Sequence, residues 1–339
     1  MTMKMQRLSA SSVLGLLVIA LSIAHADETI SGGVDRQSLD DAWWTGPILA
    51  ASASTLPQGH VLIEPYVFDV ITQKRFDSNG DRHGTPRVDS FGSLTYMLYG
   101  VTDTLTAGLI PTFGFNDLGT GQDSSGIRVG DLTFQATRRL TRFREGGRVP
   151  ALSLVLQQTI PTGKYDQLGE RPSDGIGSGA YTTTLALYSQ YYFWMPNGRI
   201  LRTRLNVSRS FSDDVNVRDV SVYGTNAGFR GQASPGDSFS INWAGEYSVT
   251  RNWVLALDVF YQHDDNTRVS GRTTELIDGQ PQQRDLRADS GSSRRFGVAP
   301  AIEYNFSGNV GVIVGARWVT HGRNVAATFT PVAAINLVY

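Results

Sequence analysis

The chain has 339 residues, of which 40% are apolar and 18% are charged, and its formal net charge is -1. This balance excludes an intrinsically disordered chain, which combines low hydrophobicity with high net charge, and it offers no basic surface to a nucleic-acid partner. The sequence contains no cysteine, which excludes disulfide scaffolds, thiolate metal sites and cysteine nucleophiles.

The first 26 residues are typical of a secretory signal peptide. Lys4 and Arg7 form a positive head, residues 13–23 form an apolar stretch, and a small-residue cleavage site ends at Ala26. The apolar stretch is too short for a membrane helix, which takes about 20 residues. We therefore predict export and cleavage near Ala26.

Residues 27–58 show no regular periodicity and are expected to form an irregular amino-terminal arm. The arm contains two adjacent tryptophans, Trp43 and Trp44, followed by a run of small residues at 50–55. Adjacent tryptophans in an exported polar segment require burial. We expect the arm to enter a barrel formed by the following strands and to plug it with Trp43 and Trp44. A loose periplasmic tail is the alternative.

From residue 59 onward, apolar or aromatic side chains occupy every second position of successive segments. In one of them Leu201, Leu205 and Val207 alternate with Arg202 and Arg204. Such alternation is typical of strands with one apolar and one polar face. The predicted strands cover residues 59–71, 88–99, 104–115, 127–140, 150–161, 181–193, 200–211, 236–249, 252–263, 294–306, 309–320 and 326–339.

The connections between these strands alternate between short turns and longer loops, and only the last, 321–325, breaks the rule. The longer loops are expected at 72–87, 116–126, 162–180, 212–235 and 264–293. An even number of antiparallel strands with this loop asymmetry is typical of a transmembrane β-barrel. A secreted β-sandwich is the alternative, but its strands are usually about five or six residues long. We predict an all-β, twelve-stranded transmembrane antiparallel barrel over residues 59–339.

Several short motifs resemble those of outer-membrane proteins grouped as the phenol-degradation meta-pathway (MetA-like) transporter family. They are Trp44-Thr45-Gly46-Pro47, Leu56-Pro57-Gln58-Gly59-His60, Ile63-Glu64-Pro65-Tyr66, Tyr99-Gly100-Val101-Thr102-Asp103, Gly130-Asp131-Leu132, Pro161-Thr162-Gly163, Gly177-Ser178-Gly179-Ala180-Tyr181 and Pro235-Gly236-Asp237-Ser238-Phe239. The resemblance covers most of the mature chain. It implies an outer-membrane channel for small, often aromatic or otherwise hydrophobic compounds, without catalytic residues.

If the apolar face of each strand contacts lipid, charged side chains lie inside the barrel. Turning an arginine to the lipid would cost about 2–4 kcal/mol at the membrane midplane. The predicted lumen-lining charges are Glu64, Asp131, Arg139, Arg202, Arg204, Glu246, Asp258, Glu303 and Arg317. Either these charges pair across the lumen and hold the barrel together, or they form a polar ladder that orients a solute. Their mixed sign argues against strong ion selectivity.

Aromatic side chains share the predicted inner face. They are Tyr66, Phe68, Tyr188, Tyr192 and Phe260. Such rings can form a path on which an aromatic solute stacks. A plug of packed rings is the alternative, and a register error of one residue would turn them toward lipid.

Candidate catalytic and metal sites are weak. Residues 77–81 offer alternate oxygen ligands, but Arg82 and Val88 stand where a calcium loop needs Gly and Glu. Ser78 lies in a Ser-Asn-Gly sequence similar to that of an outer-membrane phospholipase, yet Phe76 replaces its histidine, and His83 is the nearby alternative base. Nothing in the chain requires a cofactor or a metal, and loop 264–293 is expected to be a solvated external loop.

The sequence therefore predicts a non-enzymatic channel of a Gram-negative outer membrane for passive uptake of small hydrophobic or aromatic compounds. A general porin for small polar solutes is the closest alternative, followed by a barrel-embedded lipid hydrolase and a structural or adhesive barrel. The expected partners are outer-membrane lipid, the solute, and the barrel-assembly machinery, which would recognise the aromatic carboxyl-terminal segment ending at Tyr339.

Overall fold

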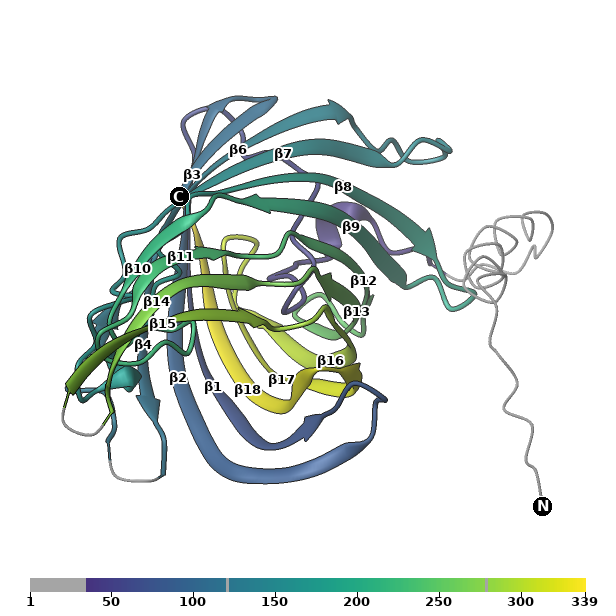
Figure 1. Ribbon diagram of the computed structural model, residues 1–339. Helices are drawn as coiled ribbons and strands as arrows, with labels where there is room; N and C mark the ends of the chain where they lie inside the picture. Colours follow the sequence, from purple (N-terminus) through teal and green to yellow (C-terminus); the bar gives the residue numbers. More distant parts are fainter. Residues whose placement is uncertain (1–34, 120–121, 278–279) are drawn as a thin grey trace, which may run out of the picture. The chain divides into compact units, whose positions relative to one another are not determined.

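The strands of the computed structural model close into one antiparallel barrel (Figure 1). The described residues are 35–119, 122–277 and 280–339; the predicted signal peptide, 1–26, and the start of the arm, 27–34, lie outside them. Strand β1 pairs with both β18 and β2, which closes the sheet. No helix within these residues is long and apolar enough to cross a membrane.

The barrel wall has twelve strands, which confirms the predicted fold. Its sheet contains 14 segments, but β3 and β4 form one strand interrupted at Pro111, and β5 and β6 form another. Proline interrupts a ladder because it has no N–H to donate. The segments are β1 (Val61–Phe76), β2 (Arg82–Thr102), β3 (Leu105–Ile110), β4 (Thr112–Asp117), β5 (Arg128–Val129), β6 (Leu132–Thr141), β7 (Ala151–Ile160), β8 (Thr182–Trp194), β9 (Ile200–Ser212), β12 (Ser238–Ser248), β13 (Trp253–Asp264), β16 (Ser293–Asn305), β17 (Val310–Arg323) and β18 (Val325–Val338).

The segment 72–87 is not the long loop that we predicted. Strands β1 and β2 continue to pair through it, with Phe76 opposite Arg82, so that only a tight turn remains. The Asp77 carboxylate forms this turn by accepting hydrogen bonds of 2.8–2.9 Å from the backbone N–H groups of residues 79, 80 and 81. Asp and Asn-Gly sequences stabilise such turns through side-chain to backbone bonds.

The predicted loops 212–235 and 264–293 are not irregular either. They contribute a second, four-stranded antiparallel sheet of β10 (Val215–Arg218), β11 (Arg230–Ser234), β14 (Arg268–Ile277) and β15 (Gln280–Asp289). Val217, Phe229 and Val269 form part of its buried core. Residues 264–293 were expected to be a solvated external loop; they form a paired hairpin instead of an irregular loop, and many of their described side chains are exposed.

The two faces of the wall differ as the alternation predicts. Leu255 and Val314 on the outer face are 51% and 60% exposed, whereas Asp258 and Glu303 on the inner face are fully buried. A surface covered with exposed leucine and valine is stable only against lipid, since apolar area in water costs about 25 cal/mol per Å². The outer surface is therefore that of a membrane barrel.

Candidate functional site

The arm lies within the barrel and connects two of its short turns (Figure 1). Because outer-membrane barrels have short periplasmic turns, we call this end the periplasmic end. Near the start of the arm, Gln37 N donates to Gly198 O (2.9 Å) in the β8–β9 turn. At its end, Gly59 N donates to Gly100 O (2.8 Å), beside the β2–β3 turn. The described part of the arm, residues 36–60, is thus fixed at both ends.

Two wall carboxylates, Glu303 of β16 and Asp258 of β13, bind the middle of the arm. Each accepts two hydrogen bonds from backbone N–H groups. The bonds to Glu303 are 2.8 and 3.0 Å long and those to Asp258 are both 3.0 Å long, and the donors are Thr45, Gly46, Ile48 and Ala50. Hydrogen bonds to a charged acceptor contribute about 1.5–3 kcal/mol each. The two carboxylates therefore hold the arm by its backbone.

Wall donors bind the carbonyl groups of the arm in the same way. The bonds run from Arg204 Nη1 to Ala50 O (2.8 Å), from Asn206 Nδ2 to Ala51 O (3.1 Å) and from Ser153 Oγ to Ala53 O (2.5 Å). The small residues at 50–55 allow this close approach, because no long side chain separates the arm from the wall. The backbone polar groups of a buried irregular segment are satisfied here by side chains of the barrel.

One buried ion network joins two of the predicted inner arginines to a single acid. Arg202 donates through Nε to Glu246 Oε2 (2.7 Å) and through Nη2 to Glu246 Oε1, and Arg204 Nε lies 3.0 Å from Glu246 Oε2. The three side chains are at most 7% exposed. These three residues therefore pair between the neighbouring strands β9 and β12, not across the lumen as predicted, and Glu303 and Asp258 bind the arm instead.

Three of the four remaining predicted charges have separate partners, and the fourth, Arg139, lines the cavity described below. Glu64 accepts a bond from Asn336 Nδ2 (3.2 Å), and the guanidinium of Arg317 lies 4.5 Å from the centroid of the Phe260 ring. Asp131 binds a loop on the opposite end of the barrel. Its carboxylate accepts from Gly163 N (3.0 Å), Ser178 N (2.8 Å) and Ser178 Oγ (2.7 Å).

The predicted inner aromatics do not form one cluster. Tyr66 is 7% exposed and packs edge-on against Tyr96 with ring centroids 6.0 Å apart. Phe68 lies over Gly92, where a Cβ atom would stand only 2.2 Å from the ring. Tyr188 shares the strand face of the buried Gln190. These rings and Phe260 lie on several strands around the lumen.

The two arm tryptophans have different surroundings. Trp43 lies at the β12–β13 turn, where its backbone N–H donates to Arg251 O (3.2 Å) and the Arg251 guanidinium stacks 4.2 Å from the centroid of its ring. Trp44 points to the wall, with Arg202 4.3 Å above its ring and Tyr192 at a centroid distance of 6.5 Å. Only Trp44 therefore contacts predicted lumen-lining residues.

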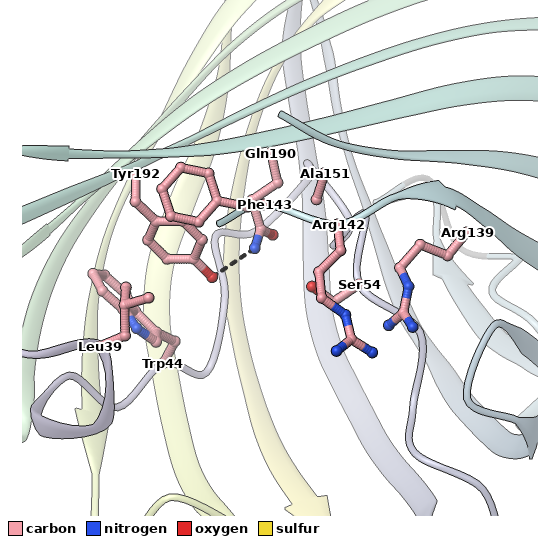
Figure 2. A pocket seen from close by; sticks show the side chains of 9 residues that line it. All are labelled: Leu39, Trp44, Ser54, Arg139, Arg142, Phe143, Ala151, Gln190 and Tyr192. Carbon is pink, nitrogen blue, oxygen red and sulfur yellow. Dashed lines mark hydrogen bonds between the residues drawn. The ribbon is translucent and has the colours of Figure 1, made fainter. Parts of the chain in front are cut away.

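A cavity of about 230 Å³ lies between the arm and the wall (Figure 2). It is lined by Leu39, Trp44, Ser54, Arg139, Arg142, Phe143, Ala151, Gln190 and Tyr192. Aromatic side chains gather on one side of the cavity in Figure 2, and the two arginines lie on the other. The side chain of Gln190 donates to Tyr192 Oη (2.7 Å) and accepts from Ser52 Oγ (3.1 Å), which fixes the wall and the arm together.

Several of these functional candidates were missed from the sequence. Asn206 and Ser153 share the inner face of their strands with buried residues, so the period of two could have identified them. Arg142 and Phe143 follow the end of β6, in a turn where alternation gives no information about direction.

The turn with Ser78 does not have the arrangement of a serine hydrolase. The Nε2 atom of His83 lies 2.8 Å from Asp77 Oδ2, and no hydrogen bond joins His83 to the Ser78 hydroxyl in the described part of the chain. A serine nucleophile needs a base within hydrogen-bond reach. The His83 contact instead lowers the pKa of Asp77 to about 2.

At the end opposite the periplasmic turns, a 3₁₀ turn, η3 (Pro172–Asp174), is bonded to the wall. Asp174 accepts hydrogen bonds from Arg128 Nε (3.0 Å) and Arg128 Nη2 (2.8 Å), and from Ser125 N (2.8 Å). The Arg128 guanidinium lowers the pKa of Asp174 to about 2. This loop is therefore held by a charged contact at neutral pH.

A family model described as "Putative MetA-pathway of phenol degradation" matches residues 73–331. Among solved structures, an outer membrane channel from Pseudomonas putida F1 is similar with a TM-score of 0.63 at 16% identity, over 86% of this chain and 100% of that one. That likeness concerns the fold.

Two further structures are less similar. The translocator domain of the autotransporter NalP from Neisseria meningitidis has a TM-score of 0.42 at 9% identity, covering 96% of this chain and 95% of that one. The toluene transporter TbuX from Ralstonia pickettii has a TM-score of 0.36 at 10% identity, covering 83% and 90%. Both scores are too low to bear on this chain. No curated protein matches the sequence.

Proposed function

The chain belongs to the MetA-pathway phenol-degradation family, and from this premise we propose that it is an outer-membrane channel for passive uptake of small hydrophobic or aromatic compounds. The observation that carries the proposal is the cavity beside the arm, where Trp44, Phe143 and Tyr192 offer ring surfaces inside a lipid-facing barrel. Ligand sites for small aromatic molecules are typically concave and lined by such rings.

The buried state of the wall acids argues against a general porin for small polar solutes. A wet porin needs charged or polar wall groups that are free to contact water and solute. Here Glu246, Glu303 and Asp258 are fully buried and already bonded to arginines or to the arm. These groups therefore serve the structure of the barrel and its arm.

The proposal assigns a role to each part of the chain. Residues 1–26 are a signal peptide cleaved near Ala26, residues 27–58 are an arm that narrows the lumen, and residues 59–339 are the barrel. Lipid of the outer membrane covers the apolar outer surface. The barrel-assembly machinery recognises the segment ending at Tyr339, whose N–H and C=O bond to the backbone of Val61.

An uptake experiment tests this function. Cells that lack the protein and cells in which it is restored are given labelled toluene, labelled phenol and a small labelled sugar. We expect restoration to accelerate uptake of the aromatics alone. Acceleration of the sugar alone would identify a general porin, and no acceleration of any solute would refute transport.

A deletion tests the role of the arm. Removing residues 28–50 from the full chain removes the four N–H groups that bind Glu303 and Asp258. We expect the conductance of the purified barrel in a planar bilayer to rise, because the segment that occupies the lumen is gone. Unchanged conductance would show that the arm does not narrow the channel.

A further inference from the structure

Two arginines at the cavity carry charges that no acid neutralises. Within the described residues, the side chains of Arg139 and Arg142 take part in none of the ion pairs. Among the other inner arginines, Arg202 and Arg204 pair with Glu246, and Arg317, which has no ion pair within the described residues, stacks on the Phe260 ring away from the cavity. The cavity is thus a place where positive charge remains available.

The neighbouring carboxylate is engaged elsewhere. Asp103, in the β2–β3 turn, accepts a hydrogen bond from Gln58 N (3.1 Å), at the end of the arm. It lies outside ion-pair distance of both cavity arginines. A guanidinium presents several N–H donors in a plane that matches a carboxylate, so Arg139 and Arg142 can bind an anion supplied by a solute.

The opposite wall of the cavity is aromatic. The centroid of the Phe143 ring lies 5.0 Å from the ring centroids of both Tyr191 and Tyr192. Trp44 extends this aromatic surface from the arm. A cavity of about 150 Å³ holds benzene, so a volume of 230 Å³ has room for one ring and a polar substituent. Figure 2 shows the aromatic rings on one side of the cavity and the two guanidinium groups on the other.

We propose that this cavity binds an aromatic carboxylate, with its ring against Trp44, Phe143 and Tyr192 and its carboxylate on Arg139 and Arg142. The inference rests on the proposed function and names its solute class more narrowly. A neutral hydrocarbon would cover the rings but leave both guanidinium groups without a partner. An aliphatic acid would satisfy the charges and leave the rings uncovered.

The position of the cavity fits release toward the periplasm. Arg142 is exposed, so the charged side of the cavity reaches solvent at the periplasmic end, whereas Gln190 and Ala151 behind it are buried. An anion that reaches this point can pass from the arginines into water without crossing a further apolar barrier.

Binding of benzoate and of its neutral counterpart benzyl alcohol to the purified full chain tests the proposal, by calorimetry and by quenching of tryptophan fluorescence. We expect wild type to bind benzoate at least tenfold more tightly than benzyl alcohol or cyclohexane carboxylate. The double variant Arg139→Gln, Arg142→Gln should lose tenfold or more in benzoate affinity and keep its affinity for benzyl alcohol. The double variant Arg139→Lys, Arg142→Lys should retain part of the benzoate affinity.

Arg148→Gln is the matched control, because Arg148 is an exposed arginine of the same turn that does not line the cavity. An equal loss of benzoate affinity in this control, or an equal loss for benzyl alcohol in the double variant, would overturn the proposal. Absence of benzoate binding with intact uptake of neutral aromatics would overturn it while the proposed function stands. Binding of benzoate without uptake of any aromatic would support the site and refute the proposed function.

Discussion

Replacing Glu303 by glutamine and Asp258 by asparagine should release the arm from the lumen. Both side chains are fully buried, and their carboxylates accept the hydrogen bonds that four backbone N–H groups of the arm donate between residues 45 and 50. The substitutions keep the size of each side chain and remove its charge. They therefore test the bonds to the arm with little change in packing.

The magnitude follows from the bonds that change. Glu303→Gln leaves a neutral oxygen that accepts the same two N–H groups about half as strongly, a loss of about 1 kcal/mol per bond. In Asp258→Asn one oxygen becomes an amide donor that cannot accept from its N–H, so one bond of about 1.5–3 kcal/mol is lost and the other weakens. Glu303→Gln should shift the ratio of bound to released arm by about 2 kcal/mol, or roughly 30-fold, and Asp258→Asn should shift it by about 2.5–4 kcal/mol, or roughly 60- to 700-fold.

Single-channel recording in planar bilayers measures this ratio as the fraction of time spent at the highest conductance. We expect the open fraction to rise in each single variant and to rise further in the double variant. Glu64→Gln is the control, because Glu64 is a predicted lumen-lining acid that bonds to Asn336 and not to the arm. An unchanged open fraction in the double variant, or an equal rise in Glu64→Gln, would refute this account of the arm.

Three further predictions concern the same structure. Gly46 has a φ of +123°, a conformation that favours glycine, so Gly46→Ala should destabilise the bound arm by about 1–3 kcal/mol and raise the open fraction. Gly59→Ala is the comparison, because Gly59 has a φ of +83° and lies outside the lumen. Glu246→Gln leaves two buried guanidinium groups without a carboxylate and should lower the free energy of unfolding by about 3–5 kcal/mol in urea titrations; a loss below 1 kcal/mol would contradict the network. The pKa of Asp174 is depressed from 3.8 to about 2, so its stabilisation of roughly 1–2 kcal/mol is complete above pH 4 and lost as the pH falls toward 2; this part of the pH dependence of Tm should vanish in Asp174→Asn.

The twelve strands were predictable because the barrel wall contacts two different environments. The side chains of each strand must point alternately to lipid and to the lumen, and the alternation of Leu255 and Leu257 with Asp258 follows this rule. The second sheet was not predictable in the same way. Its strand β10 (Val215–Arg218) has four residues, so only Val215 and Val217 can show the period, which is too few to separate a strand from a loop.

The inner positions of the site could be predicted, but the partners of its charges could not. Alternation places Glu303 and Asp258 on the inner face, and simple electrostatics then suggests arginine partners for them. Their observed partners are backbone N–H groups of the arm. Every residue except proline carries the same N–H group, so no side-chain pattern in residues 45–50 identifies the binding partner.

Because most of the inner charges bind the arm or one another, the number of charged residues in the wall does not by itself indicate which solute the channel passes. Acids and arginines that bind the arm or one another are buried, so a passing ion does not reach them. Selection then depends on the groups that remain, which at the periplasmic end are the aromatic rings around Tyr192 and the guanidinium groups of Arg139 and Arg142, which form no ion pair in the part of the chain that the structure describes. The predicted lumen-lining charges are nearly balanced in sign, and their number alone predicts no preference between anions and cations. The bonding pattern predicts a preference for aromatic anions, because the inner acids are engaged and the two arginines that line the cavity form no ion pair within the described residues.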